Sequence, residues 1–234
     1  MVVPLEDDFV VVPLQDNSDP GPGEPAPLPD GVILFDALTD GTSSGQVSGG
    51  AFGPRGWTHF SGGDKIFYDL GQTMEAGIVE FELTGISPAT RGGYLQPGWE
   101  RAYYFGLFNN PSGNKGRGGG NPAFIEIRYN WGNNYANLSA VKFQVGDRGL
   151  FNCCHGEEFG TKPWRDWNPI QYYRHKVVFG DGSAALFIDD AFQVQINYTN
   201  RPLGWRYLFV GAVNYVVGAP DNVTYRNVKV TKIK

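Results

Sequence analysis

Residues 173–190 read YRHKVVFGDGSAALFIDD, and this stretch decides the fold. Two apolar runs, 176–179 and 184–188, flank the segment Gly-Asp-Gly-Ser at 180–183. Glycine adopts the positive φ that tight turns require, so the stretch predicts a β-hairpin.

Short strands of this kind are predicted throughout residues 31–234. Apolar and polar residues alternate in 79–83 (VEFEL), 125–130 (IEIRYN) and 141–145 (VKFQV). A period of two indicates a sheet with one face in the core and the other in water. Further strands are predicted at 103–108, 207–213 and 228–233. No run of ten or more residues has helical periodicity, so we expect an all-β, two-sheet antiparallel sandwich.

Composition and charge argue against nucleic-acid binding and membrane insertion. The 234 residues include 33 Gly and 16 Pro, 15% are aromatic, and the net charge of -5 includes no long basic run. Nucleic acid is therefore a poor candidate partner. No apolar stretch approaches the roughly 18 residues that cross a bilayer, so no membrane insertion is predicted. The first eight residues, MVVPLEDD, lack the basic start and apolar run of a signal peptide.

Residues 1–30 differ from the rest of the chain. Residues 16–30 are rich in proline and have almost nothing to bury, a composition that favours an extended spacer. We expect an extended N-terminal arm and Pro-rich linker at 1–30, followed by one domain at 31–234. The arm's apolar residues would lie along a protein partner: Val2, Val3, Leu5, Phe9, Val11 and Leu14.

The hairpin at 173–190 resembles the concanavalin A-like lectin/glucanase superfamily, which includes laminin-G-like domains. In that superfamily a strand of the form aromatic-His-x-Val-x-Phe turns through Asp-Gly into a strand ending in Ile-Asp. The segments 63–70, 208–211 and 223–230 resemble its other strands. The resemblance implies a jelly roll of two curved antiparallel sheets, whose concave face commonly holds sugar. Asp190 stands where the family usually has Gly, which puts the turn type in question.

The superfamily contains lectins, carbohydrate-binding modules, hydrolases, lyases and adhesion domains, so the fold cannot decide the function. Its retaining glucanases carry Glu-x-Asp-x-x-Glu, which is missing from this sequence. The nearest patterns are Glu80-x-Glu82, interpreted as a solvated strand face, and Glu126-x-Arg128. We lean towards a non-catalytic domain; in an enzyme, Glu126, Arg128 and Tyr104 would carry the chemistry.

Carbohydrate binding has better support, because sugar rings stack on aromatic planes while a few polar groups fix the hydroxyls. Two segments, 129–135 and 164–168, combine Trp and Tyr with Asn, Arg and Asp. If the strands are neighbours, a cleft is predicted from Tyr104, Glu126, Arg128, Trp131, Tyr135, Lys142, Gln144, Trp164 and Trp167. The alternative is that Trp164 and Trp167 only cover an end of the sandwich.

Metal binding has only weak signals. The resemblance implies a possible structural calcium ion, with Asp36, Asp64 and Asp221 as candidate ligands. The adjacent Cys153 and Cys154 permit a metal site, a vicinal disulfide or two ordinary thiols.

These patterns together predict a lectin-like domain, carbohydrate-binding or adhesive, that is displayed on a larger assembly through its arm. A virion capsid decoration or fibre protein would suit such a chain, and the expected location is extracellular or on a virion surface. A glycoside hydrolase or polysaccharide lyase, a carbohydrate-binding module of a secreted enzyme and a purely structural assembly protein remain as alternatives.

Overall fold

The structure is a computed structural model that describes residues 28–61, 63–85, 100–112, 124–131, 140–146, 155–159, 168, 170–198, 204–211 and 222–233. At 100–104, 128–131, 140–142, 144, 146 and 155–159 it describes the backbone. The predicted arm lies almost wholly outside these residues, because residues 1–27 are not among them, and the predicted domain boundary at residue 30 stays a prediction. The described segments contain strands and turns and no helix, so none of them includes a helix that could cross a membrane.

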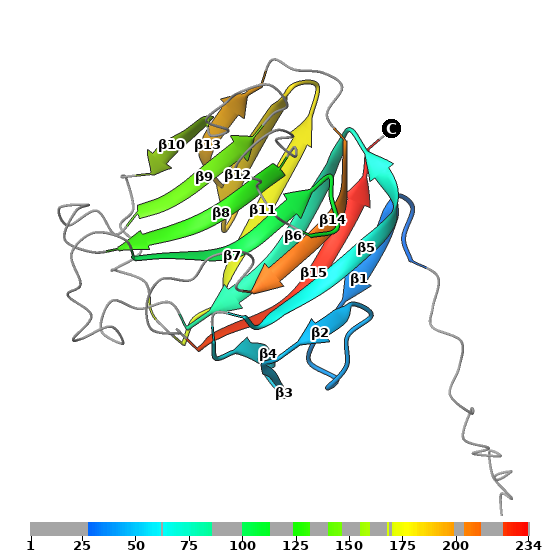
Figure 1. Ribbon diagram of the computed structural model, residues 1–234, viewed down its shortest axis with the longest axis vertical. Helices are drawn as coiled ribbons and strands as arrows, with labels where there is room; N and C mark the ends of the chain where they lie inside the picture. Colours follow the sequence, from blue (N-terminus) through cyan, green and yellow to red (C-terminus); the bar gives the residue numbers. More distant parts are fainter. Residues whose placement is uncertain are drawn as a thin grey trace, which may run out of the picture.

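The strands form two antiparallel sheets, which confirms the predicted fold class (Figure 1). The eight-stranded sheet has the order β13 (Ala191–Asn197), β12 (Ser183–Ile188), β11 (Tyr173–Gly180), β6 (Gly77–Thr84), β15 (Val223–Lys232), β4 (Gly56–His59) and β3 (Ala51–Gly53), and β1 (Val32–Asp36) also pairs with β15. The seven-stranded sheet has the order β10 (His155–Phe159), β9 (Ala140–Gly146), β8 (Phe124–Trp131), β7 (Glu100–Phe108), β14 (Trp205–Gly211), β5 (Lys65–Met74) and β2 (Gln46–Ser48).

The hairpin that decides the fold is present as predicted. β11 pairs with β12 from His175 opposite Ile188 to Gly180 opposite Ser183. The two turn residues, Asp181 and Gly182, have φ of 46° and 72°. Both values lie in the left-handed region, which suits the twist of a two-residue hairpin.

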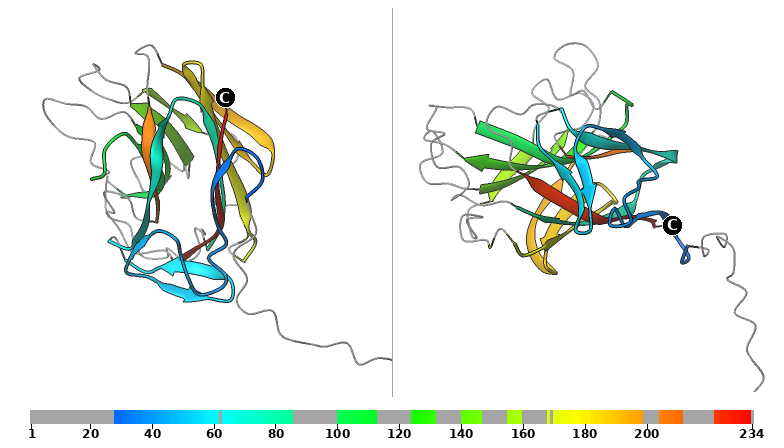
Figure 2. Two further views of the ribbon diagram at one scale, coloured as in Figure 1. Left: turned by 90° about the vertical axis from the view of Figure 1, so that its right-hand side faces the viewer. Right: turned by 90° about the horizontal axis from the view of Figure 1, so that it is seen from below.

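The core lies between the two sheets, which face each other in Figure 2. Alternate residues of β6, β11 and β12 are buried, as the period of two predicted. Phe81 of β6 stacks on Phe105 of β7, with ring centroids 5.2 Å apart. Phe179 of β11 meets Trp205 of β14 edge to face at 5.1 Å. Aromatic contacts therefore join the sheets at two places.

The outer faces of the two sheets differ. On the eight-stranded sheet, Glu82 pairs with Arg226 at 2.6 Å and Glu80 pairs with Lys229 at 3.1 Å, all partly exposed. On the seven-stranded sheet, Glu126 is fully buried, and so are Phe108 and Phe124. The expectation that Glu126 belongs to a wet face is therefore wrong: this part of the outer face is covered, and two phenylalanines on it are buried as well.

Candidate functional site

The outer face of the seven-stranded sheet carries the predicted site. Strand pairing places one residue from each strand in a row across this face. The row is Gln46, Phe67, Phe209, Gly106, Glu126, Gln144 and Gly156. Glu126 is thus the direct cross-strand neighbour of Gln144.

The next row brings further predicted residues together. Arg128 pairs with Lys142 on one side and with Tyr103 on the other. Tyr104 lies in the irregularity between Tyr103 and Phe105. Strands β7, β8 and β9 are therefore neighbours, which is the condition that the predicted cleft required.

Trp131, the other predicted residue on a described strand, is not brought to this face. Trp131 pairs with Glu100 at the end of β8. It is separated from Glu126 by an odd number of positions, and in a regular strand an odd separation assigns two residues to opposite faces. Tyr135, Trp164 and Trp167 lie outside the described residues, so their part in the cleft stays a prediction.

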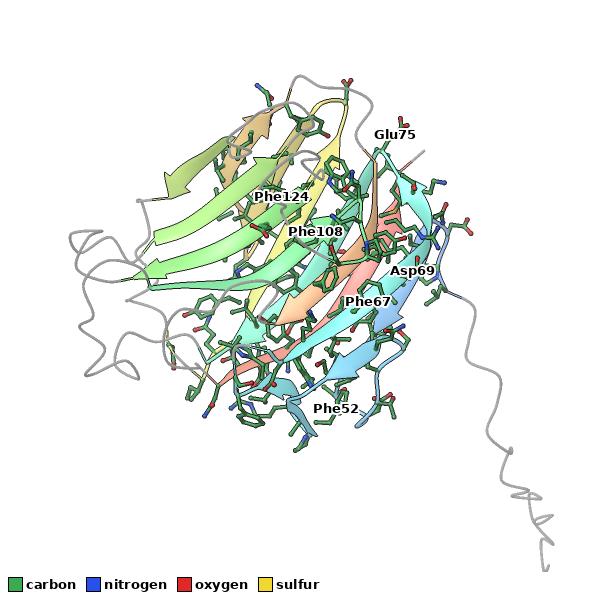
Figure 3. All side chains as sticks on the ribbon, viewed as in Figure 1. Phe52, Phe67, Asp69, Glu75, Phe108 and Phe124 are labelled. Atoms are coloured by element: carbon green, nitrogen blue, oxygen red, sulfur yellow. The ribbon has the colours of Figure 1, made fainter. Side chains whose placement is uncertain are left out.

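An aromatic cluster adjoins Glu126 on the same face. Its members are Phe67, Phe108, Phe124, Tyr207 and Phe209, and Figure 3 shows Phe67, Phe108 and Phe124 in a line across the strands. The Phe108 ring lies 6.1 Å from Phe124 and meets Phe209 edge to face at 5.5 Å. Phe67 and Tyr207 form a stacked pair with centroids 5.8 Å apart, and both are partly exposed.

Charged groups border this stacked pair. The Arg206 guanidinium donates two hydrogen bonds to Asp69, at 2.6 and 2.8 Å, and lies 5.5 Å from the Tyr207 ring centroid. These hydrogen bonds hold the pKa of the Asp69 carboxyl below its usual value. The Lys65 ammonium lies 5.6 Å from the Phe209 ring centroid. An aromatic plane beside fixed donors and acceptors can hold a polyhydroxylated ring.

Phe67 and Tyr207 were missed from the sequence. The signal was present, because 65–70 (KIFYDL) and 205–210 (WRYLFV) place large apolar residues on both faces of their strands. A strand that is apolar on both faces has an outer face that is covered or used. That signal identifies an unusual face, and only the strand order shows that the two residues meet.

The described side chains do not bring two carboxyl groups close enough together for retaining glycoside hydrolysis. Retaining hydrolysis needs carboxyl groups about 5 Å apart. Apart from Glu126, the carboxylate whose side chain is described on this face is Asp69, on β5. Strands β7 and β14 separate it from β8, and Arg206 already holds it.

Two of the three candidate calcium ligands, Asp36 and Asp64, accept hydrogen bonds from protein groups. Asp36 Oδ2 accepts hydrogen bonds from the Ser43 hydroxyl at 2.7 Å and from Tyr68 at 3.1 Å. Burial, with the Asp36 carboxylate beside it, raises the pKa of Tyr68. Asp64 accepts from the Phe60 amide at 2.8 Å. The described residues contain no cluster of three or more metal-ligating side chains. Asp221, Cys153 and Cys154 lie outside them.

Comparison with known proteins gives structural matches alone. No family model matches the sequence, and no curated protein matches it. A Trypanosoma rangeli sialidase is 14% identical with a TM-score of 0.57, covering 96% of this chain and 34% of its own. The chain thus spans about a third of that protein.

Two other solved structures match over most of their own length. The Crh5 transglycosylase is 11% identical with a TM-score of 0.55, covering 86% of this chain and 84% of its own. A Bacillus licheniformis beta-glucanase is 12% identical with a TM-score of 0.54, covering 87% of this chain and 99% of its own. The two antiparallel sheets and these matches confirm the expected fold: the chain is a concanavalin A-like jelly-roll sandwich.

Proposed function

We propose that this jelly roll is a non-catalytic, lectin-like domain that binds a glycan on the outer face of its seven-stranded sheet. The observation that carries the proposal is the partly exposed Phe67–Tyr207 stack bordered by Asp69 and Arg206. An aromatic plane packs against the C–H face of a sugar, and the charged pair offers an acceptor and a donor to its hydroxyls.

The predicted polar residues extend this surface. Glu126, Gln144, Arg128 and Lys142 occupy two neighbouring rows on adjacent strands. A glycan that runs across the strands from the Phe67–Tyr207 stack would cross β14 and β7 and then lie over β8, which carries the buried Glu126. The surface therefore suits an extended oligosaccharide better than a single ring.

The structural matches support a sugar as the ligand class. The T. rangeli sialidase has been solved in complex with sialic acid, and the Crh5 transglycosylase with NAG. In these two complexes the matched chains are each 11% identical to this chain. Such distant matches support the class of ligand and name no particular sugar.

A hydrolase or lyase is the second candidate, and the complete burial of Glu126 favours it. A carboxyl group shielded from water is the environment in which enzymes keep a general acid protonated. In this alternative Glu126 acts with Arg128 and Tyr104 on a bound polysaccharide.

Glycan binding is tested with Tyr207→Ala, measured on a glycan array and by titration calorimetry against the best array ligand. Loss of stacking should weaken binding about tenfold or more. Phe192→Ala is the matched control, because Phe192 is a 59% exposed aromatic on the other sheet. Equal affinity of Tyr207→Ala and the wild type would overturn the proposal.

Catalysis is separated from binding by Glu126→Gln. In a lectin, no polysaccharide is cleaved by the wild type, and the variant changes only affinity. Release of reducing ends or unsaturated products by the wild type, abolished in Glu126→Gln, would replace the lectin with the enzyme.

We further propose that residues 1–30 attach the domain to a larger assembly, such as a virion capsid or fibre, on an extracellular or virion surface. The support is the composition of the arm, whose apolar residues precede a proline-rich spacer. A chain without residues 1–30 should fold and bind glycan normally but fail to incorporate into its assembly.

A further inference from the structure

A groove lies on the outer face of the eight-stranded sheet, opposite the face proposed above. It has a volume of about 310 Å³ and is open to solvent. Strands β1, β6, β11 and β15 form it, with Phe35, Glu80, Phe81, Glu82, Arg174, Asn227 and Lys229 as its lining. Its size lies at the lower end of the range for small-molecule sites.

A β-bulge in β15 builds one wall of this groove. The register of β15 against β6 shifts between Arg226 and Lys229, and Asn227 has a φ of 54°. The Asn227 amide donates a hydrogen bond to the Ala37 carbonyl at 3.1 Å, which anchors the bulge. The extra residue lets Arg226, Asn227 and Lys229 share the outer face while Val228 stays buried. Bulges of this kind re-aim side chains and are common beside binding sites.

The charges of the groove are balanced. Glu80 pairs with Lys229 at 3.1 Å, and Arg174 pairs with Asp190. Glu82 accepts from Arg226 at 2.6 Å and from the Asn227 side-chain amide at 3.1 Å. Each carboxylate retains lone pairs that can accept from a ligand. The groove therefore presents donors and acceptors side by side without a net charge.

Phe35 adds an apolar surface at one end of the groove. It is 49% exposed and lies directly opposite Lys229 in the pairing of β1 with β15. A half-exposed phenylalanine beside paired charges provides a stacking surface next to hydroxyl partners. Outside the lining, the Arg226 guanidinium carbon lies 3.7 Å from the centroid of the Tyr172 ring, a contact that helps to hold the cation that pairs with Glu82.

We propose that this groove is a second saccharide site, which takes a neutral hexose unit. A neutral polyol both donates and accepts hydrogen bonds, so it matches a lining whose charges already cancel. A charged ligand would have to compete with the ion pairs that line the groove. The inference concerns a different face from the proposed glycan site and does not depend on it.

The test uses the ¹⁵N-labelled full chain, titrated with neutral hexasaccharides of glucose, mannose and galactose. A hexasaccharide of glucuronate serves as the charged comparison. At least one neutral probe should shift the amide signals of Glu80, Glu82, Asn227 and Lys229, and the charged probe should bind this groove more weakly. Unmoved groove signals with every neutral probe, or tighter binding of the glucuronate probe, would overturn the proposal.

Two variants remove contacts without disturbing the strands. Asn227→Gly keeps the backbone conformation and the backbone hydrogen bond to Ala37, because glycine adopts positive φ freely. It removes the side chain, whose amide donates to Glu82. It should weaken binding at the groove about fivefold. Phe35→Ala should weaken it about tenfold, whereas Phe192→Ala, outside the lining, should leave it unchanged. Wild-type affinity in both groove variants would also overturn the proposal.

The titration distinguishes binding at the groove from binding at the seven-stranded sheet. Saccharide-induced shifts at the groove that survive Tyr207→Ala support the second site even if the seven-stranded sheet binds nothing. Shifts confined to Phe67, Tyr207 and Phe209, abolished by Tyr207→Ala, would leave the first proposal standing and remove the second.

Discussion

Two buried histidines, His59 and His175, have their acid–base behaviour changed by the fold. His175 is fully buried, stacks on Phe81 at 5.0 Å and has its Nδ1 3.0 Å from the Tyr173 carbonyl. His59 is 2% exposed, and its ring centroid lies 6.4 Å from that of Trp57 and 6.1 Å from that of Tyr225. Burial lowers the pKa of each to about 4. Both therefore belong to the core, although a sequence alone leaves any histidine as a candidate for chemistry.

Stability should consequently fall as the pH falls from 6.5 towards 4. In that window the unfolded chain binds protons at His59 and His175, whose ordinary pKa is 6.5, while the folded chain does not. Each histidine contributes at most about 1.4 kcal/mol per pH unit, and the contribution is complete above pH 6.5. Urea unfolding between pH 5 and 7 measures the slope. A flat free energy of unfolding there, or imidazole signals of His59 and His175 that titrate near 6.5, would contradict the burial.

Two-residue turns set the geometry of the eight-stranded sheet at the scale of elements. Asp189 and Asp190 join β12 to β13 with φ of 50° and 63°. Asp189 accepts a hydrogen bond from the Arg174 amide at 2.8 Å, and Asp190 contacts the Arg174 guanidinium. The turn thus keeps the left-handed backbone that glycine favours, even though the sequence departs from the superfamily pattern at Asp190. The hydrogen bond of Asp189 explains why that aspartate is suited to its position.

Asp190→Gly should therefore stabilise the domain by about 1 kcal/mol. Glycine removes the strain of a left-handed L-residue, while the lost pair with Arg174 is exposed and contributes little. Asp189→Gly is the matched variant and should gain less, because it loses the hydrogen bond to the Arg174 amide. Thermal and urea unfolding of both variants measure the difference. The opposite ranking would show that the ion pair outweighs the backbone strain.

The whole molecule is held together by apolar side chains that meet between the sheets. Phe179 of β11 is 2% exposed and packs against Trp205, which also meets Tyr198 edge to face. The Phe179–Trp205 contact joins β11 of one sheet to β14 of the other, so it forms only when both sheets are assembled. Neither proposed site takes part in this contact, which allows stability and binding to be varied separately.

Phe179→Ala should lower the free energy of unfolding by about 3–5 kcal/mol, through the loss of buried area and the cavity left behind. Phe192→Ala, which removes a 59% exposed ring, should change it by less than about 0.5 kcal/mol. Urea unfolding compares the two. If the two losses were similar, the contact between the sheets would not have the importance assigned to it.

The sequence by itself determined many of the strands and the alternation of faces along them, because alternation and turn chemistry are local properties. The hairpin at 173–190 and the burial of Val79, Phe81 and Leu83 were predictable for this reason. Only the tertiary structure decided which strands are neighbours, because pairing joins segments far apart in the chain. The row that joins Phe67, Phe209 and Glu126, and the bulge that turns Asn227 and Lys229 to one face, arise from that pairing. Both proposed sites lie where distant strands meet.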